Sequence, residues 1–171
     1  MKYIHLNIFF VLIFSISLFA QSTNQKPCAS PAAKQFDFWI GEWDLTWIDK
    51  NGQTQTGENI ISKILNGCVI EENFTGGNFI GKSVSVYNTN KKQWQQTWVD
   101  NSGGYLDFTG SFENNQMILS RQFTNKDGKV IKQRMVFYNI FKNELDWNWE
   151  KSTDSGKTWQ LEWKIHYKRR K

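Results

Sequence analysis

The sequence predicts an all-β protein, a single antiparallel up-and-down barrel of about ten strands preceded by a short helical turn. From Trp43 onward, apolar and polar residues alternate with a period of two, which is typical of strands with one buried face. Short polar connections separate these segments, and Asn66-Gly67 is the strongest local signal for a hairpin. No interior segment has helical periodicity long enough for crossover helices, which argues against a parallel α/β sheet.

The N-terminal part of the chain is expected to be a signal peptide and a lead-in segment. Lys2 is followed by an apolar run from Ile8 to Ala20, which is shorter than the roughly 20 apolar residues of a transmembrane helix. A charged start, an apolar middle and a small final residue are typical of a secretory signal, so we assign residues 1–20 to a signal peptide. An uncleaved anchor is the alternative. Residues 21–33 are polar, contain both prolines and form the lead-in.

Residues 34–171 are expected to form one barrel domain. Residues 34–40 (KQFDFWI) are the one plausible helical turn. The expected strands are 43–47, 54–65, 68–74, 82–87, 93–99, 105–111, 117–123, 130–140, 145–151 and 159–168. Evenly spaced strands with hairpin turns favour an up-and-down barrel or a sandwich, and closure into a barrel removes exposed edges.

Charge and cysteine content limit the classes of partner. After removal of residues 1–20, the chain has 20 Lys and Arg residues and 16 acidic ones, a net charge of +4. Part of this positive charge lies in the tail 168–171. Without a basic stripe on a recognisable module, we expect no nucleic-acid partner. The two cysteines, Cys28 and Cys68, both lie in the exported part, where an oxidising compartment favours a disulfide between them. Two cysteines alone cannot form a structural zinc site, so we expect no metal.

The tryptophans allow two interpretations. All nine remain after cleavage, and those on one strand mostly fall in phase, as Trp147 does with Trp149. They either fill a packed core or form the wall of a cavity for a small apolar or flat ligand. For the second interpretation, the expected wall consists of Tyr87, Trp98, Trp147 and Trp149.

Two arginines are the expected polar anchors of such a ligand. Arg121 is in phase with Met117 and Leu119, and Arg134 is in phase with Val136. An Arg on an apolar face either snorkels from a barrel end or is paired inside. Either guanidinium would suit the carboxylate of a ligand.

Several motifs carry a resemblance to known barrels. Gly41-Glu42-Trp43, after the helical turn, resembles the Gly-x-Trp signature of lipocalins and other calycins. That resemblance implies that Trp43 plugs the closed end of the barrel, with Arg169 or Arg170 packed over it. FDFWIGEWDLTW, LNGCVIEENFTGG, WQQTWVD and STDSGKTW, in this order, resemble an exported bacterial family of unknown function with a lipocalin-like barrel. This likeness spans about residues 28–169 and leaves the function open.

The chain also resembles, more distantly, the nitrobindin-like barrels, which bind haem through a histidine near the C-terminus. His166 is the only histidine left after cleavage and lies near the C-terminus. However, the later glycines of the Gly-x-Trp-x-Gly-x-Gly motif are missing, and His166 shares its strand face with Glu162 and Lys164. We therefore expect no cofactor, with haem on His166 as an alternative.

The segment 152–159 fits the Asp-box pattern Ser-x-Asp-x-Gly-x-Thr-Trp. In this pattern Asp154 caps turn amides, Gly156 accepts a positive φ, and Trp159 packs beneath the hairpin. A single copy indicates a hairpin and no sialidase. With one histidine, Ser-His-Asp catalysis is not expected. Acidic residues in or beside strands leave a two-carboxylate enzyme open; they are Glu71, Glu72, Asp100, Asp107, Asp146 and Glu150.

The leading hypothesis is a periplasmic or secreted barrel that binds a small hydrophobic or amphipathic molecule. We expect no stable membrane span after signal cleavage, and we assign no catalytic residue. The alternatives are a carbohydrate-binding or protein-interaction module with outward tryptophans, a haem protein using His166, and a carboxylate-based enzyme.

Overall fold

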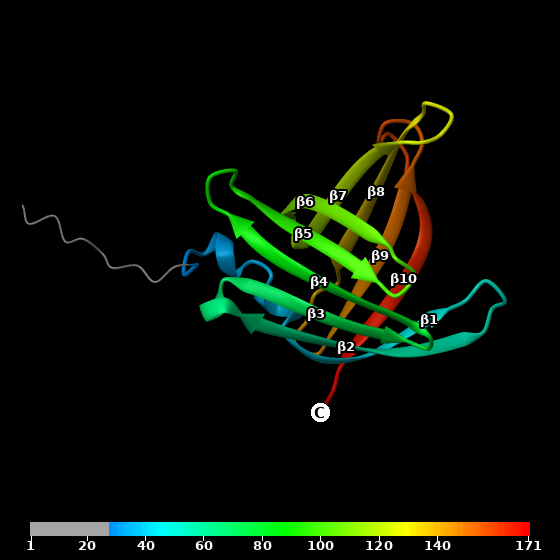
Figure 1. Ribbon diagram of the computed structural model, residues 1–171. Coiled ribbons are helices and arrows are strands. Elements are labelled where there is room, and N and C mark those ends of the chain that lie inside the picture. Colours follow the sequence, from blue (N-terminus) through cyan, green and yellow to red (C-terminus); the bar gives the residue numbers. More distant parts are fainter. Residues whose placement is uncertain (1–27) are drawn as a thin grey trace, which may run out of the picture.

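The computed structural model describes residues 28–171 as ten strands and three short 3-10 helices (Figure 1). The expected signal peptide and most of the lead-in segment lie outside these residues. The strands are β1 (Gly41–Ile48), β2 (Thr54–Ile64), β3 (Val69–Gly76), β4 (Phe79–Asn88), β5 (Gln93–Asp100), β6 (Tyr105–Glu113), β7 (Gln116–Thr124), β8 (Val130–Tyr138), β9 (Glu144–Ser152) and β10 (Gln160–Arg169). The 3-10 helices are η1 (Ala32–Lys34), η2 (Asp37–Trp39) and η3 (Leu65–Gly67).

The strands form a closed barrel in which each strand pairs with its neighbours in sequence, and β1 closes on β10. Every pairing is antiparallel. The sequence-based prediction of an all-β barrel of about ten antiparallel strands is thereby confirmed. The helical turn expected at residues 34–40 appears as the two turns η1 and η2. Asn66-Gly67 does connect two strands, within η3 and with a positive φ at both residues.

Aromatic residues before β1 plug one end of the barrel. Phe36 and Trp39 are fully buried, and their rings stack with centroids 4.9 Å apart. Both rings also contact Phe137 of β8 edge-on, at 5.1 and 5.0 Å. Edge-to-face and offset contacts are the favourable geometries for aromatic pairs, so this end is closed by a well-packed cluster.

Arg169, at the end of β10, locks this plug to the barrel. Its guanidinium lies 4.1 Å from the ring centroid of Trp43 and donates hydrogen bonds to the carbonyls of Ile40 (2.7 Å) and Phe38 (3.2 Å). A Cβ at Gly41 would stand only 2.1 Å from Arg169 Nη1, so the first residue of the Gly-x-Trp motif makes room for this arginine. Arg169 thus occupies the place that the calycin resemblance implies.

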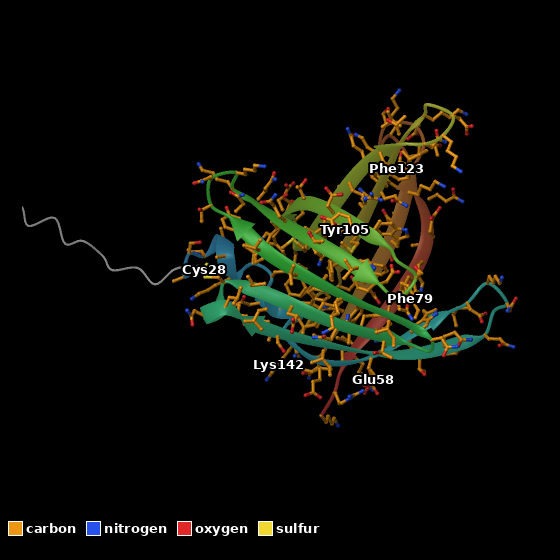
Figure 2. All side chains as sticks on the ribbon, viewed as in Figure 1. Cys28, Glu58, Phe79, Tyr105, Phe123 and Lys142 are labelled. Carbon is orange, nitrogen blue, oxygen red and sulfur yellow. A yellow bond between two sulfur atoms is a disulfide. The ribbon has the colours of Figure 1, made fainter. Side chains whose placement is uncertain are left out.

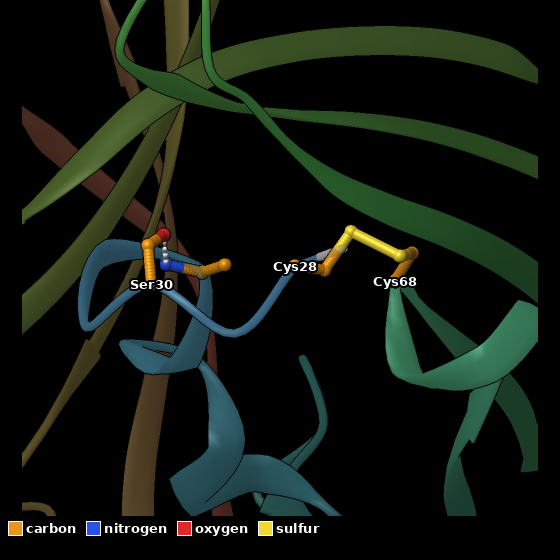
Figure 3. Close-up of a disulfide and its surroundings, with 4 residues drawn as sticks. Cys28, Ser30 and Cys68 are labelled. Atoms are coloured by element: carbon orange, nitrogen blue, oxygen red, sulfur yellow. Dashed lines mark hydrogen bonds between the residues drawn. A yellow bond between two sulfur atoms is a disulfide. The ribbon is translucent and has the colours of Figure 1, made fainter. Parts of the chain in front are cut away.

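The predicted Cys28–Cys68 disulfide is confirmed (Figure 3). It joins Cys28 of the lead-in segment to Cys68, the residue after η3, with a Cα–Cα distance of 5.1 Å. Nearby, the Ala33 amide donates to Ser30 Oγ at the start of η1. The disulfide therefore fixes the chain just before the plug to the β2–β3 connection.

The opposite end of the barrel flares. β1 and β10 pair only from Trp43↔Arg169 to Thr46↔His166, although both strands continue beyond Thr46 and before His166. In Figure 1 the β1–β2 hairpin and the β9–β10 hairpin point away from each other. Phe79, at the start of β4, lies near the flared end (Figure 2). Among residues 28–171, no helix has the length and apolarity needed to cross a membrane.

Candidate functional site

A cavity of about 220 Å³ lies inside the barrel, between the aromatic plug and the flared end. Ten of its fifteen lining residues are aromatic, so the wall is built mainly from rings. The aromatic residues are Trp39, Phe74, Phe79, Trp98, Phe108, Phe137, Trp147, Trp149, Trp163 and Tyr167, and the others are Glu72, Asp100, Leu106, Met135 and Ile165. The interior is therefore partly hollow.

Strands β9 and β10 supply one side of this wall. Trp147 and Trp149 are two residues apart and therefore lie on the same face of β9, which lines the cavity. Trp163 of β10 pairs with Trp149 across the two strands. The Trp147 and Trp163 rings meet at 90° with centroids 5.7 Å apart. Phe108 of β6 meets Trp149 at 82° and 5.8 Å. These edge-to-face contacts hold the rings in fixed orientations.

Trp98 forms the opposite side, and Gly81 makes its position possible. A Cβ at Gly81 would lie 2.0 Å from the Trp98 ring, so the indole rests directly on the glycine backbone. Phe74 and Phe79 flank the same ring at centroid distances of 6.0 and 6.1 Å. The Trp98 indole N–H donates to Asp100 Oδ2 at 3.1 Å, which fixes the rotation of the ring.

Glu72 is the buried acid of the cavity. It lies on β3 with 6% of its surface exposed, and it accepts hydrogen bonds from Asn59 Nδ2 (2.7 Å) and Ser83 Oγ (2.6 Å). Burial raises the pKa of Glu72 to about 7, although these two hydrogen bonds act in the opposite direction. Within residues 28–171, Glu72 forms no ion pair.

Asn59 links Glu72 to Tyr167. Its amide nitrogen also donates to the Tyr167 hydroxyl at 3.3 Å, while its amide oxygen is buried and has no partner among the described residues. Burial, and then the nearby charge of Glu72, raise the pKa of the Tyr167 phenol far above its usual range. Tyr167 therefore stays neutral and keeps its hydroxyl as a hydrogen-bond donor and acceptor.

Asp100 is the second acid of the lining and lies toward the flared end. It accepts hydrogen bonds from the amides of Ser102 (2.9 Å) and Gly104 (3.0 Å) and from the Ser102 hydroxyl. The Ser102 hydroxyl, followed by the Gly104 amide and the Trp98 indole, lowers the pKa of Asp100 to about 2. Asp100 is therefore ionised at neutral pH and is engaged in capping the β5–β6 turn.

No model of a known protein family matches the chain. A search of curated proteins likewise finds no significant match. The geometry of the cavity is therefore the basis for assigning a function.

The structure brings together three of the residues expected in the ligand wall. Trp98, Trp147 and Trp149 all line the cavity. Tyr87 also faces inward, but it lies near the closed end, where it packs on the buried Trp94 with a centroid distance of 5.8 Å. Tyr87 is therefore not part of the cavity lining.

Neither expected arginine anchor lines the cavity. Arg121 faces inward on β7, where Arg121 Nη1 donates to Gln133 Oε1 at 3.0 Å and the guanidinium lies 5.1 Å from the Phe123 ring centroid. These contacts hold it beyond the cavity, near the β7–β8 turn. The turn itself (residues 125–129) follows directly after β7.

Arg134 lies on the outer face of β8, opposite to its expected position. It forms an ion pair with Glu150 (2.6 Å), and its guanidinium lies 4.0 Å from the centroid of the Trp159 ring. The inward positions of β8 are Ile131, Gln133, Met135 and Phe137. The prediction for Arg134 followed the apolar Val136, which is in phase with it; Val136 lies on the outer face as well and is nevertheless buried, at 6% exposure. Arg134 therefore belongs to an outer ion pair and not to the cavity.

The Asp-box residues form a hairpin end. Asp154 accepts hydrogen bonds from the Thr158 amide (2.9 Å) and hydroxyl (2.7 Å), and Gly156 has a φ of +91°. Trp159 packs against Arg134 on the outside of the barrel. All of these contacts are structural and lie away from the cavity.

His166 faces outward. Its Nδ1 lies 3.0 Å from Asp146 Oδ1, and the side chain borders an external groove of about 460 Å³ where β1 and β10 diverge. Trp163 lines both this groove and the interior cavity, and its ring meets Trp47 at 5.5 Å. The histidine therefore does not present a nitrogen to the cavity, as an interior haem would require.

Among the site residues, Glu72 was considered from the sequence only as one acid of a two-carboxylate enzyme, and Gly81 was assigned no role. Glu72 is in phase with the apolar Ile70 and Phe74, and a charged residue in such a series is the local sign of a buried acid. Gly81 lies within the strand β4, and a glycine inside a strand often marks a place where another group approaches the backbone closely. Both signals are present in the sequence, but neither identifies the contacting residue.

Proposed function

We propose that the protein is an exported barrel that binds a small aromatic or otherwise apolar molecule in the interior cavity. The aromatic lining is the observation that carries this proposal. Ligand sites are typically concave and mostly apolar, with a few polar groups that fix orientation. Here the polar groups are Glu72, Asp100 and Tyr167.

The size of the cavity limits the ligand. Its volume of about 220 Å³ lies below the 300–1,000 Å³ common for drug-sized ligands. A single substituted ring suits this space better than a long acyl chain. The positions of the tryptophans favour this function over an outward binding platform, because each of the nine indole side chains is buried or half-buried.

Two features support export. The Cys28–Cys68 disulfide is typical of proteins that reside in oxidising compartments. Residues 1–20 have the pattern of a secretory signal. Together with the resemblance to an exported barrel family, they support a location in the periplasm or outside the cell.

The binding function is tested with 2-phenylethanol, a neutral single-ring probe. The protein, secreted into an oxidising compartment, is titrated while the indole N–H signals are followed by NMR. We expect saturable binding with one site. Leu106→Trp, which fills the cavity, should abolish binding, whereas Val99→Trp on the outer face of β5 should leave it unchanged. Absence of saturable shifts, or equal binding by both variants, would refute the proposal.

A further inference from the structure

The charges that line the cavity are all of one sign. Glu72 and Asp100 are the acidic residues of the lining, and no Lys, Arg or His from residues 28–171 belongs to it. In a low-dielectric interior, a like charge is repelled strongly and an opposite charge is attracted strongly. A carboxylate ligand, which an arginine anchor would receive, is thus disfavoured, whereas a cation is favoured.

The hydrogen-bonding capacity of Glu72 is only partly used. Each carboxylate oxygen accepts one bond, Oε1 from Asn59 and Oε2 from Ser83, although a carboxylate offers about four acceptor sites. A buried charge without a counter-ion is costly, and a buried acceptor favours any donor that reaches it. The remaining acceptor sites suit the N–H groups of an ammonium ion, which would also supply the missing positive charge.

The aromatic wall suits the same type of ligand. Trp98, Trp147, Trp149 and Trp163 surround the space that Glu72 borders. Indole faces attract cations, and desolvated sites strengthen the attraction. A bare metal ion is a poor fit, because no group of three or more His, Cys, Asp or Glu residues converges within residues 28–171.

We propose that the cavity selects small organic cations, specifically amines carried on an aromatic ring, and that Glu72 receives the ammonium group while the indoles enclose the apolar part. This inference rests on the proposed binding function and adds the chemical class of the ligand. It also reverses the expectation of an anionic ligand that the two arginines suggested.

Three probes of nearly equal shape test the inference: phenethylamine is a cation, 2-phenylethanol is neutral, and 3-phenylpropionate is an anion. Each is titrated by calorimetry at pH 8, where Glu72 is ionised. We expect phenethylamine to bind at least tenfold more tightly than 2-phenylethanol, and 3-phenylpropionate to bind most weakly. Glu72→Gln should remove the preference for the amine and leave the affinity for 2-phenylethanol within about twofold.

Glu71→Gln is the matched control, because Glu71 precedes Glu72 on the same strand and does not line the cavity. It should retain the preference for the amine. Equal affinities for the amine and the alcohol, or tightest binding of the propionate, would overturn the inference while leaving the binding function intact. If none of the probes binds, the proposed binding function fails and the inference fails with it.

Discussion

Replacing Glu72 with Gln should stabilise the protein at alkaline pH and have little effect in acid. The carboxyl is buried and has no counter-ion among residues 28–171, so ionisation is unfavourable in the folded state. Gln preserves the shape of the side chain. Its amide oxygen can accept from Asn59, and its amide nitrogen can donate to Ser83 Oγ, which replaces both existing contacts.

The magnitude follows from the pKa of Glu72 in the two states. Burial raises it from 4.5 to about 7. Between these values the folded protein binds a proton that the unfolded chain has released, so stability falls as pH rises. Below pH 4.5 Glu72 is protonated in both states and does not reduce stability, whereas above about pH 7 the full loss of stability is reached. At 1.36 kcal/mol for each pKa unit, the loss amounts to about 3 kcal/mol.

Urea unfolding of the wild type and of Glu72→Gln, at pH 4.5 and at pH 8, measures this difference. The other acids titrate in both proteins, so their effects cancel when the two are compared. We expect the variant to be more stable by about 3 kcal/mol at pH 8 and to match the wild type within about 0.5 kcal/mol at pH 4.5. Glu71→Gln should follow the wild type at both pH values. If the variant and the wild type differ by the same amount at both pH values, Glu72 does not ionise in a buried site and the reasoning is wrong.

Three further variants test other parts of the structure. Replacing Cys28 and Cys68 together with Ser should destabilise the protein by about 4 kcal/mol, because the disulfide closes a loop of 40 residues; the melting temperature with and without reductant checks this. Arg169→Met should cost about 3 kcal/mol in urea unfolding, since it removes three hydrogen bonds from the guanidinium to backbone carbonyls. Gly81→Ala should displace the Trp98 ring and weaken binding of 2-phenylethanol at least tenfold, with altered tryptophan fluorescence; unchanged affinity would contradict the contact.

The strands and their order could be predicted from sequence because their signals are local. Alternation with a period of two identifies a strand, and Asn-Gly or Gly-rich connections place the turns between antiparallel neighbours. The disulfide could be predicted equally well, because a chain with two cysteines allows a single intramolecular pairing. The bounds of the helical turn were predicted less accurately, since η1 begins before the expected range of residues 34–40.

The cavity could be predicted only in part, because its lining depends on side chains from strands that are distant in the sequence. Trp147 and Trp149 were placed correctly, since β9 has aromatic residues on one face only. Arg134 was misplaced because β8 buries residues on both faces, Val136 outside as well as Met135 and Phe137 inside, so alternation does not determine which face is internal. Glu72 is in phase with Ile70 and Phe74 on β3, but a charged strand residue is more commonly solvated, so this local signal alone did not identify Glu72 as a buried acid.

The position of Glu72 is hard to explain by stability alone. A neutral or apolar side chain at this site would avoid an ionisation cost of about 3 kcal/mol at neutral to alkaline pH. Instead, Asn59 and Ser83 from the two neighbouring strands and Tyr167 from β10 supply polar groups around the acid. Buried acids with raised pKa values cluster at functional sites, where a local departure from good packing is offset by binding. A bound ammonium ion would supply the counter-charge that Glu72 does not find within residues 28–171. The ligand that we propose should therefore stabilise the protein most strongly at the pH where Glu72 destabilises it.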